Sequence, residues 1–198
     1  MDAEQRVSLL ERGMALASEI SPHYDDVLRE ASSRIGASGS VGKGDIAMLA
    51  FWKRIPTGSW DVRLLSTSEE RVREVTAPAV AALTTDAKGP DLIAAAQRAR
   101  ELLRDLPGFG RGSPMASAVL TAIRPSDLAV YDTHANKGLK FVGLDLALNA
   151  DLHYSEFLRR IEQCREEARA LRGHLWSAHE VDLALYKLGK NSRGSSGS

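Results

Sequence analysis

The spacing of apolar residues is the feature that most constrains what this chain can fold into. Apolar residues recur at intervals of three and four, as at Val7, Leu10 and Met14, which places them along one face of an α-helix. No segment alternates apolar and polar residues as a half-buried strand does, and β-branched residues never cluster over the length of a strand. The sequence therefore predicts an all-α protein.

Residues that start or stop helices divide the chain into about nine or ten expected helices. These span 3–20, 22–35, 45–54, 60–65, 69–83, 91–106, 114–123, 133–142, 154–171 and 178–188, with 144–152 left unassigned. Pro22 is expected at the first position of its helix, Pro78 is expected to kink or split the helix that contains it, and Gly189 is expected to end the last helix. We expect residues 1–190 to form one domain. Residues 191–198 are expected to be a disordered tail, because their Gly- and Ser-rich composition resembles an expression linker.

Charge and cysteine content exclude several classes of protein. The 198 residues include 26 basic and 26 acidic side chains, and a net charge of zero argues against an indiscriminate polyanion binder. The single Cys164 excludes an internal disulfide, a cysteine-ligated iron–sulfur cluster and a cysteine-rich zinc site. No zinc-like spacing of His, Cys, Asp and Glu occurs, so we expect no metal. There is no signal-peptide pattern and no apolar run long enough to cross a bilayer, so we expect a cytoplasmic protein without a membrane partner.

A tight turn is expected at residues 106–110, Leu-Pro-Gly-Phe-Gly, between two helical segments. Proline fixes one backbone angle and glycine permits conformations that other residues avoid, so such a turn exposes its backbone. Backbone N–H groups there, together with the positive end of the following helix, can bind phosphate without reading bases. Between 98 and 124 there are five arginines and two acidic residues, a net charge of plus three that indicates a local phosphate-binding surface.

A second motif follows the turn. Small and apolar residues from 116 to 123 predict a closely packed helix, and the sequence Tyr-Asp-Thr-His at 131–134 comes after it. Asp132 suits the N-cap of the next helix, since its side chain can accept hydrogen bonds from backbone N–H groups of the first turn. From the residues alone, Asp132 is either a helix cap or a catalytic carboxylate, and His134 is expected to be structural.

Together the two motifs resemble those of the helix-hairpin-helix DNA glycosylase superfamily, over about 45 residues from 99 to 143. The hairpin of that family reads L-P-G-x-G, and its catalytic aspartate lies in a V-D-T-H-type motif. The resemblance implies two interleaved helical lobes with a cleft, and the removal of a modified or damaged base that is flipped out of double-stranded DNA. It implies that Asp132 stabilises the positive charge developing on the sugar, or activates the attacking water, as the glycosidic bond breaks.

The resemblance also implies which residues contact the DNA. Phosphate contacts are expected from Gly108, Phe109, Gly110, Arg111, Gly112, Ser113 and Lys137. Trp52, Trp60 and Tyr131 are candidates for stacking on an extruded base, although aromatic residues more often pack in a core. We expect a monomer without a cofactor or iron–sulfur cluster, except that the hairpin could bind a monovalent cation.

The sequence departs from the family in two ways. Bifunctional members place a Schiff-base lysine near the start of the helix after the hairpin, whereas residues 111–116 here contain no lysine. Any activity is therefore expected to be monofunctional hydrolysis, without strand cleavage. About two residues are also inserted between 110 and 114, which alters the hairpin. The alternative function is that of a non-catalytic helix-hairpin-helix protein that binds DNA or another partner.

Overall fold

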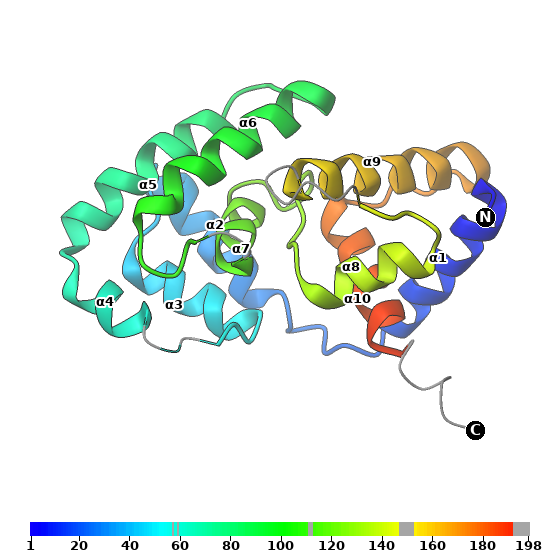
Figure 1. The fold of residues 1–198 in the computed structure, drawn as a ribbon, viewed down its shortest axis with the longest axis horizontal. Coiled ribbons are helices and arrows are strands. Elements are labelled where there is room, and N and C mark those ends of the chain that lie inside the picture. Colours follow the sequence, from blue (N-terminus) through cyan, green and yellow to red (C-terminus); the bar gives the residue numbers. More distant parts are fainter. Residues whose placement is uncertain (57, 59, 111–112, 147–152, 192–198) are drawn as a thin grey trace. The chain divides into compact units, whose positions relative to one another are not determined.

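The computed structural model describes residues 1–56, 58, 60–110, 113–146 and 153–191 (Figure 1). Within these ranges it contains ten α-helices, one short 3₁₀ helix and no strand, which confirms the expected all-α class. Among the same residues, no helix combines the length and the apolar character needed to cross a membrane. The chain divides into two units: a terminal unit made of residues 1–21 and the chain from 126 onward, and a central unit made of residues 22–125.

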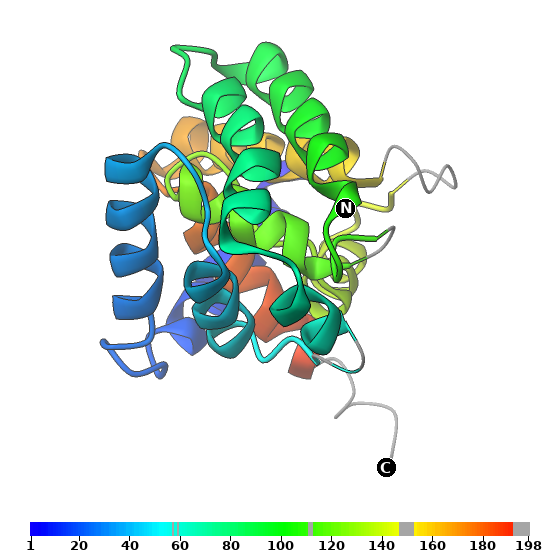
Figure 2. The ribbon, with the colours of Figure 1, turned by 90° about the vertical axis from the view of Figure 1, so that its left-hand side faces the viewer.

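The central unit is built around α7. Its helices are α2 (Asp26–Ser38), α3 (Lys43–Trp52), α4 (Trp60–Ser66), α5 (Glu69–Leu83), α6 (Gly89–Leu102), the 3₁₀ helix η1 (Leu103–Asp105) and α7 (Pro114–Ile123). Eight of the ten residues of α7 are buried, because their small side chains let α2, α3, α5 and α6 contact it closely. Helices α5 and α6 lie side by side, as Figures 1 and 2 show.

The terminal unit is built around α10. Its helices are α1 (Ala3–Ala17), α8 (Thr133–Phe141), α9 (His153–Arg172) and α10 (Ala178–Asn191). Helix α10 contacts each of the other three. Leu10 of α1, Phe157 of α9 and Leu185 of α10 are all completely buried, so residues from both ends of the sequence share one core.

Glycines let the backbones of α8 and α10 touch. A Cβ added to Gly138 of α8 would collide with the carbonyl oxygen of Leu185, and a Cβ added to Gly189 of α10 would collide with that of His134. A third glycine, Gly13 of α1, also brings its helix close to α10, though less so, since an added Cβ would lie 2.8 Å from the carbonyl oxygen of Ala184. The position of α8 on α10 therefore depends on two residues that have no side chain.

A largely buried ion pair and a buried thiol lie at the junction of α1 and α9. The guanidinium of Arg6 donates to both carboxylate oxygens of Glu167, at 2.6 and 3.3 Å, and to the carbonyl of Val142 at 3.1 Å. This fork geometry joins α1, α9 and the end of α8. Burial, with Glu167 nearby, raises the pKa of the Cys164 thiol to about 12, so this cysteine stays protonated at neutral pH.

Several helix boundaries differ from those expected. Helix α2 begins at Asp26 and not at Pro22, because Tyr24 packs on Trp52 and Asp25 accepts the Trp52 indole N–H, which ties this segment to α3. Helix α5 has the expected bounds and continues through an exposed Pro78.

The expectation that Gly189 ends the last helix is wrong. Helix α10 runs on to Asn191, because Gly189 serves the contact with α8. Asn191, expected to open the tail, is therefore the last helical residue. Residues 192–198 and 147–152 lie outside the described residues.

Adding a methyl group at the α8–α10 contact should destabilise the protein strongly. We expect Gly138→Ala and Gly189→Ala each to lower the free energy of unfolding by about 3 kcal/mol or more, because backbone atoms of a packed helix cannot move aside as a flexible side chain can. Urea denaturation followed by circular dichroism measures this.

Gly36→Ala is the matched control, since Gly36 also lies inside a helix but an added Cβ meets nothing within 4 Å. This change should raise the free energy of unfolding by about 0.5–1 kcal/mol, through helix propensity alone. Equal effects at all three glycines would contradict the proposed helix contact.

Candidate nucleic-acid interface

The hairpin at 106–110 is a turn of the central unit whose apolar residues are anchored in the core. Leu106 is 4% exposed and Phe109 is 1% exposed, so both side chains point inward. Gly108 adopts a left-handed backbone conformation, with φ of +91°, that favours glycine. A Cβ at this position would also lie 2.6 Å from the indole ring of Trp60, so the turn packs its backbone against that ring.

Some backbone N–H groups of the hairpin are bonded within the protein and others are not. The N–H of Phe109 donates to the carbonyl of Leu106 at 3.1 Å. Among the residues that the structure describes, the N–H groups of Gly108 and Gly110 have no hydrogen-bond partner. Gly110 is exposed, and a Cβ added to it would meet nothing within 4 Å. An anion could therefore approach Gly110 closely.

Ser113 connects the hairpin to α7. Its hydroxyl donates to the carbonyl of Gly108 at 2.6 Å and accepts the N–H of Met115 at 3.1 Å, so the same oxygen closes the turn and caps the helix. Ser113 is the N-cap of α7, and the expected bounds of this helix, 114–123, are confirmed. The predicted contact residues Arg111 and Gly112 lie outside the described residues.

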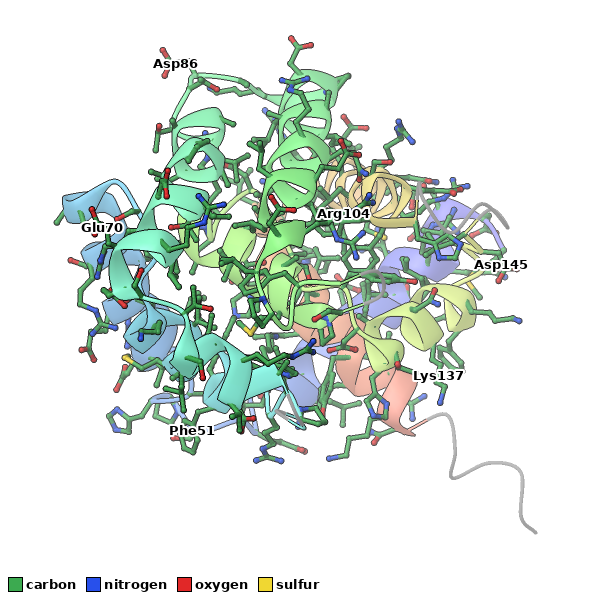
Figure 3. All side chains as sticks on the ribbon, turned by 60° about the vertical axis from the view of Figure 1, so that its left-hand side comes forward. Phe51, Glu70, Asp86, Arg104, Lys137 and Asp145 are labelled. Atoms are coloured by element: carbon green, nitrogen blue, oxygen red, sulfur yellow. The ribbon has the colours of Figure 1, made fainter. Side chains whose placement is uncertain are left out.

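The arginines around the hairpin are not equally available. Arg124 donates to the carbonyls of Leu83 and Thr85, at 3.0 and 2.9 Å, and so holds the end of α5. Arg100 is only 9% exposed. Arg98 and Arg104 are exposed, and Arg104 is labelled in Figure 3. Of the described arginines between 98 and 124, these two are the ones whose charge faces solvent.

Asp132 lies in the terminal unit, at the N-cap of α8. One of its carboxylate oxygens accepts the N–H of His134 at 2.7 Å and that of Ala135 at 2.8 Å. The segment before it is fixed as well, since Leu128, Ala129 and Val130 are at most 1% exposed. Asp132 itself is partly exposed. The carboxylate is thus held in one orientation by the start of a helix whose own position depends on its glycine contact with α10.

Two residues close to Asp132 in the sequence, Tyr131 and His134, make aromatic contacts. The ring of Tyr131 meets that of Phe157 edge-on, with centroids 5.3 Å apart, and its hydroxyl lies 3.5 Å from Nδ1 of His153. His134 meets the ring of Tyr186 edge-on at 5.2 Å, which agrees with a structural role. Lys137 lies farther along α8 and is half-buried (Figure 3).

The predicted base-stacking residues divide between the two units. Trp52 and Trp60 line one cavity of about 910 Å³ in the central unit, whereas Tyr131 belongs to the terminal unit. Trp52 is 3% exposed, and Trp60 also supports Gly108 of the hairpin. Sequence reasoning missed this support because no local pattern connects an indole to a turn so far along the chain.

No group of three or more His, Cys, Asp or Glu side chains in the described part of the chain is arranged to hold a metal ion. Comparison with protein-family models, with curated proteins and with solved structures finds no match to this chain.

The capping role of Asp132 can be tested separately from its negative charge. We expect Asp132→Ala to lower the free energy of unfolding by about 1 kcal/mol, because two backbone N–H groups lose their acceptor. Asp132→Asn should stay within about 0.5 kcal/mol of the wild type, since an amide oxygen caps a helix nearly as well. Thermal unfolding of the three proteins tests this, and an Asp132→Ala protein as stable as the wild type would refute the capping role.

Proposed function

We propose that this protein is a monofunctional DNA glycosylase-like enzyme. Its substrate would be double-stranded DNA that contains a modified or damaged base, and its reaction the hydrolysis of the N-glycosidic bond of that base. The observation that carries the proposal is the carboxylate of Asp132, held by two backbone N–H groups at the start of α8. The motif around it resembles the one that carries the catalytic aspartate of helix-hairpin-helix glycosylases.

The chemistry needs a carboxylate whose position does not change. As the bond between sugar and base breaks, positive charge develops on the sugar ring. A fixed carboxylate stabilises that charge without having to reorganise, or accepts a proton from the attacking water. The N-cap bonds of Asp132 supply this rigidity, and the partial exposure of the residue leaves room for a substrate to approach.

The hairpin supplies the DNA contact in this proposal. The N–H groups of Gly108 and Gly110 are the backbone donors that a phosphate would accept, and Arg104 adds a positive charge on the same segment. Phe109 acts as the buried anchor of the turn, because its side chain is in the core and its N–H is bonded to Leu106. Since residues 111–116 contain no lysine, the reaction ends at an abasic site and the strand stays intact.

Base release is the direct test of catalysis. Duplexes carrying alkylated, oxidised, deaminated or bulky-modified bases are incubated with the protein, and hot alkali then converts abasic sites to strand breaks. We expect one class of duplex to be cleaved only after alkali, and Asp132→Asn to lower the rate at least about 100-fold while the protein remains folded. Activity that survives Asp132→Asn, or the absence of cleavage on every duplex, would rule out this role.

A non-catalytic DNA-binding function is the second candidate, and one observation favours it. The bonds that Asp132 accepts from the N–H groups of His134 and Ala135 are ordinary N-cap bonds, which many helices have without any catalytic role. In that case the hairpin would still bind phosphate and no base would be released.

DNA affinity tests the hairpin separately from the chemistry. Arg104→Glu should weaken binding to an unmodified duplex about tenfold at low salt, because it replaces a positive charge beside the hairpin by a negative one. Arg169→Glu, the same charge change on an exposed residue of α9, is the control and should leave the affinity nearly unchanged. Equal losses would mean that the hairpin is not the binding surface.

A further inference from the structure

A cavity in the central unit has walls that suit an apolar ligand. Its volume is about 910 Å³, within the range of sites that bind small molecules. Helices α3 and α4 and residues 54–56 form much of the wall, together with Tyr24 and Val27 from near the start of α2. Trp52, which is buried, and Trp60, which is partly exposed, are among the lining residues, and the indole of Trp60 offers an aromatic surface.

The rim of the cavity exposes large apolar side chains to water. Phe51 is 80% exposed and Leu65 is 69% exposed, and both line the cavity. Figure 3 shows Phe51 at the outer surface of its helix. An exposed phenyl ring and an exposed leucine beside a cavity form an apolar surface that gains free energy when a ligand covers it.

Most hydrogen-bond donors around the cavity are bonded within the protein. The indole N–H of Trp52 donates to Asp25 at 3.3 Å, and that of Trp60 donates to the carbonyl of Pro56 at 3.0 Å. The ammonium group of Lys43 donates to the carbonyls of Leu65 and Thr67 at the end of α4. These groups are therefore unlike the set of free donors that a nucleobase edge would require.

Arg54 differs from these donors. It lines the cavity and is exposed, and its guanidinium has no hydrogen bond or ion pair among the described residues. Its backbone is in the left-handed region, with φ of +50°, and no other non-glycine residue of the described chain has a positive φ.

The fold places Arg54 where glycine is usual. The N–H of Ile55 donates to the carbonyl of Ala50 at 2.8 Å, and that of Arg54 donates to Phe51 at 3.1 Å, which closes the end of α3. An arginine at such a position costs about 1 kcal/mol relative to glycine. Backbone strain of this kind is concentrated at functional sites, where the position of the side chain serves the function.

We propose that this cavity binds a small amphipathic anion, with a bulky apolar or aromatic body and one carboxylate- or sulfonate-like head. The body lies against Trp60 and the exposed ring of Phe51, and the head pairs with Arg54. The charged side chains that line the cavity favour a ligand with a single negative charge. Lys43 and Arg54 are positive and Asp61 is negative, while His23 is bonded to Asp26. The site lies wholly within the central unit and does not depend on Asp132 or on any DNA activity.

Two fluorescent probes with the same kind of body test the proposal. 1-Anilinonaphthalene-8-sulfonate carries the anionic head, and N-phenyl-1-naphthylamine lacks it. We expect saturable binding of one sulfonate probe per chain, with the neutral probe about tenfold weaker because the ion pair with Arg54 is missing. Absence of saturable binding by the sulfonate probe would overturn the proposal.

Arg54→Gly isolates the guanidinium, because glycine suits the left-handed backbone and should raise the stability of the protein. This variant should bind the sulfonate probe about tenfold more weakly and the neutral probe as the wild type does. Arg54→Lys should retain part of the preference for the anion. Unchanged binding of the sulfonate probe to Arg54→Gly would remove Arg54 from the site.

Phe51→Ser tests the apolar wall without disturbing the core, since Phe51 is exposed. Both probes should bind at least about fivefold more weakly to it. Phe141→Ser is the matched control, because Phe141 is a 43% exposed phenylalanine on α8 of the terminal unit. If the two serine variants bind the probes equally, the probes lie elsewhere.

Discussion

The contact between α8 and α10 is the constraint on which the terminal unit depends. Gly138 and Gly189 bring the two helix backbones together, and no other residue type fits at either position. Asp132 is the N-cap of α8, so this contact also sets where the carboxylate lies. The orientation of the carboxylate follows from the first turn of α8, because two N–H groups of that turn donate to one oxygen of Asp132. Packing, helix capping and the candidate chemistry are consequences of one arrangement of backbone atoms.

The central unit depends on a different kind of contact, in which an indole supports a turn. Trp60 packs against the backbone of Gly108, and the buried side chain of Phe109 anchors the turn in the core. Ser113 links the turn to α7. Trp60 also forms part of the cavity that we assign to an amphipathic anion. One side chain therefore stabilises the hairpin and lines a separate binding site, so a ligand in the cavity contacts a residue that supports the hairpin.

Helical periodicity and helix start and stop signals were enough to predict the all-α class and the bounds of α5 and α7. Local rules failed where tertiary contacts decide. The sequence predicts that Gly189 ends a helix, whereas the contact with α8 requires a glycine inside α10. The sequence predicts that Arg124 is part of a basic surface, whereas its guanidinium donates hydrogen bonds to carbonyls at the end of α5. The left-handed conformation of Arg54 has no local signal, because it depends on how α3 ends beside the cavity.

The central claim is that Asp132 acts on the sugar of an extruded nucleotide. A crystal structure of the protein bound to a duplex that carries an abasic-site analogue tests this claim most directly. If Asp132 has this role, its carboxylate will lie within about 4 Å of the anomeric carbon of the analogue. A complex in which the analogue stays away from Asp132, while the carboxylate does no more than cap α8, would contradict it.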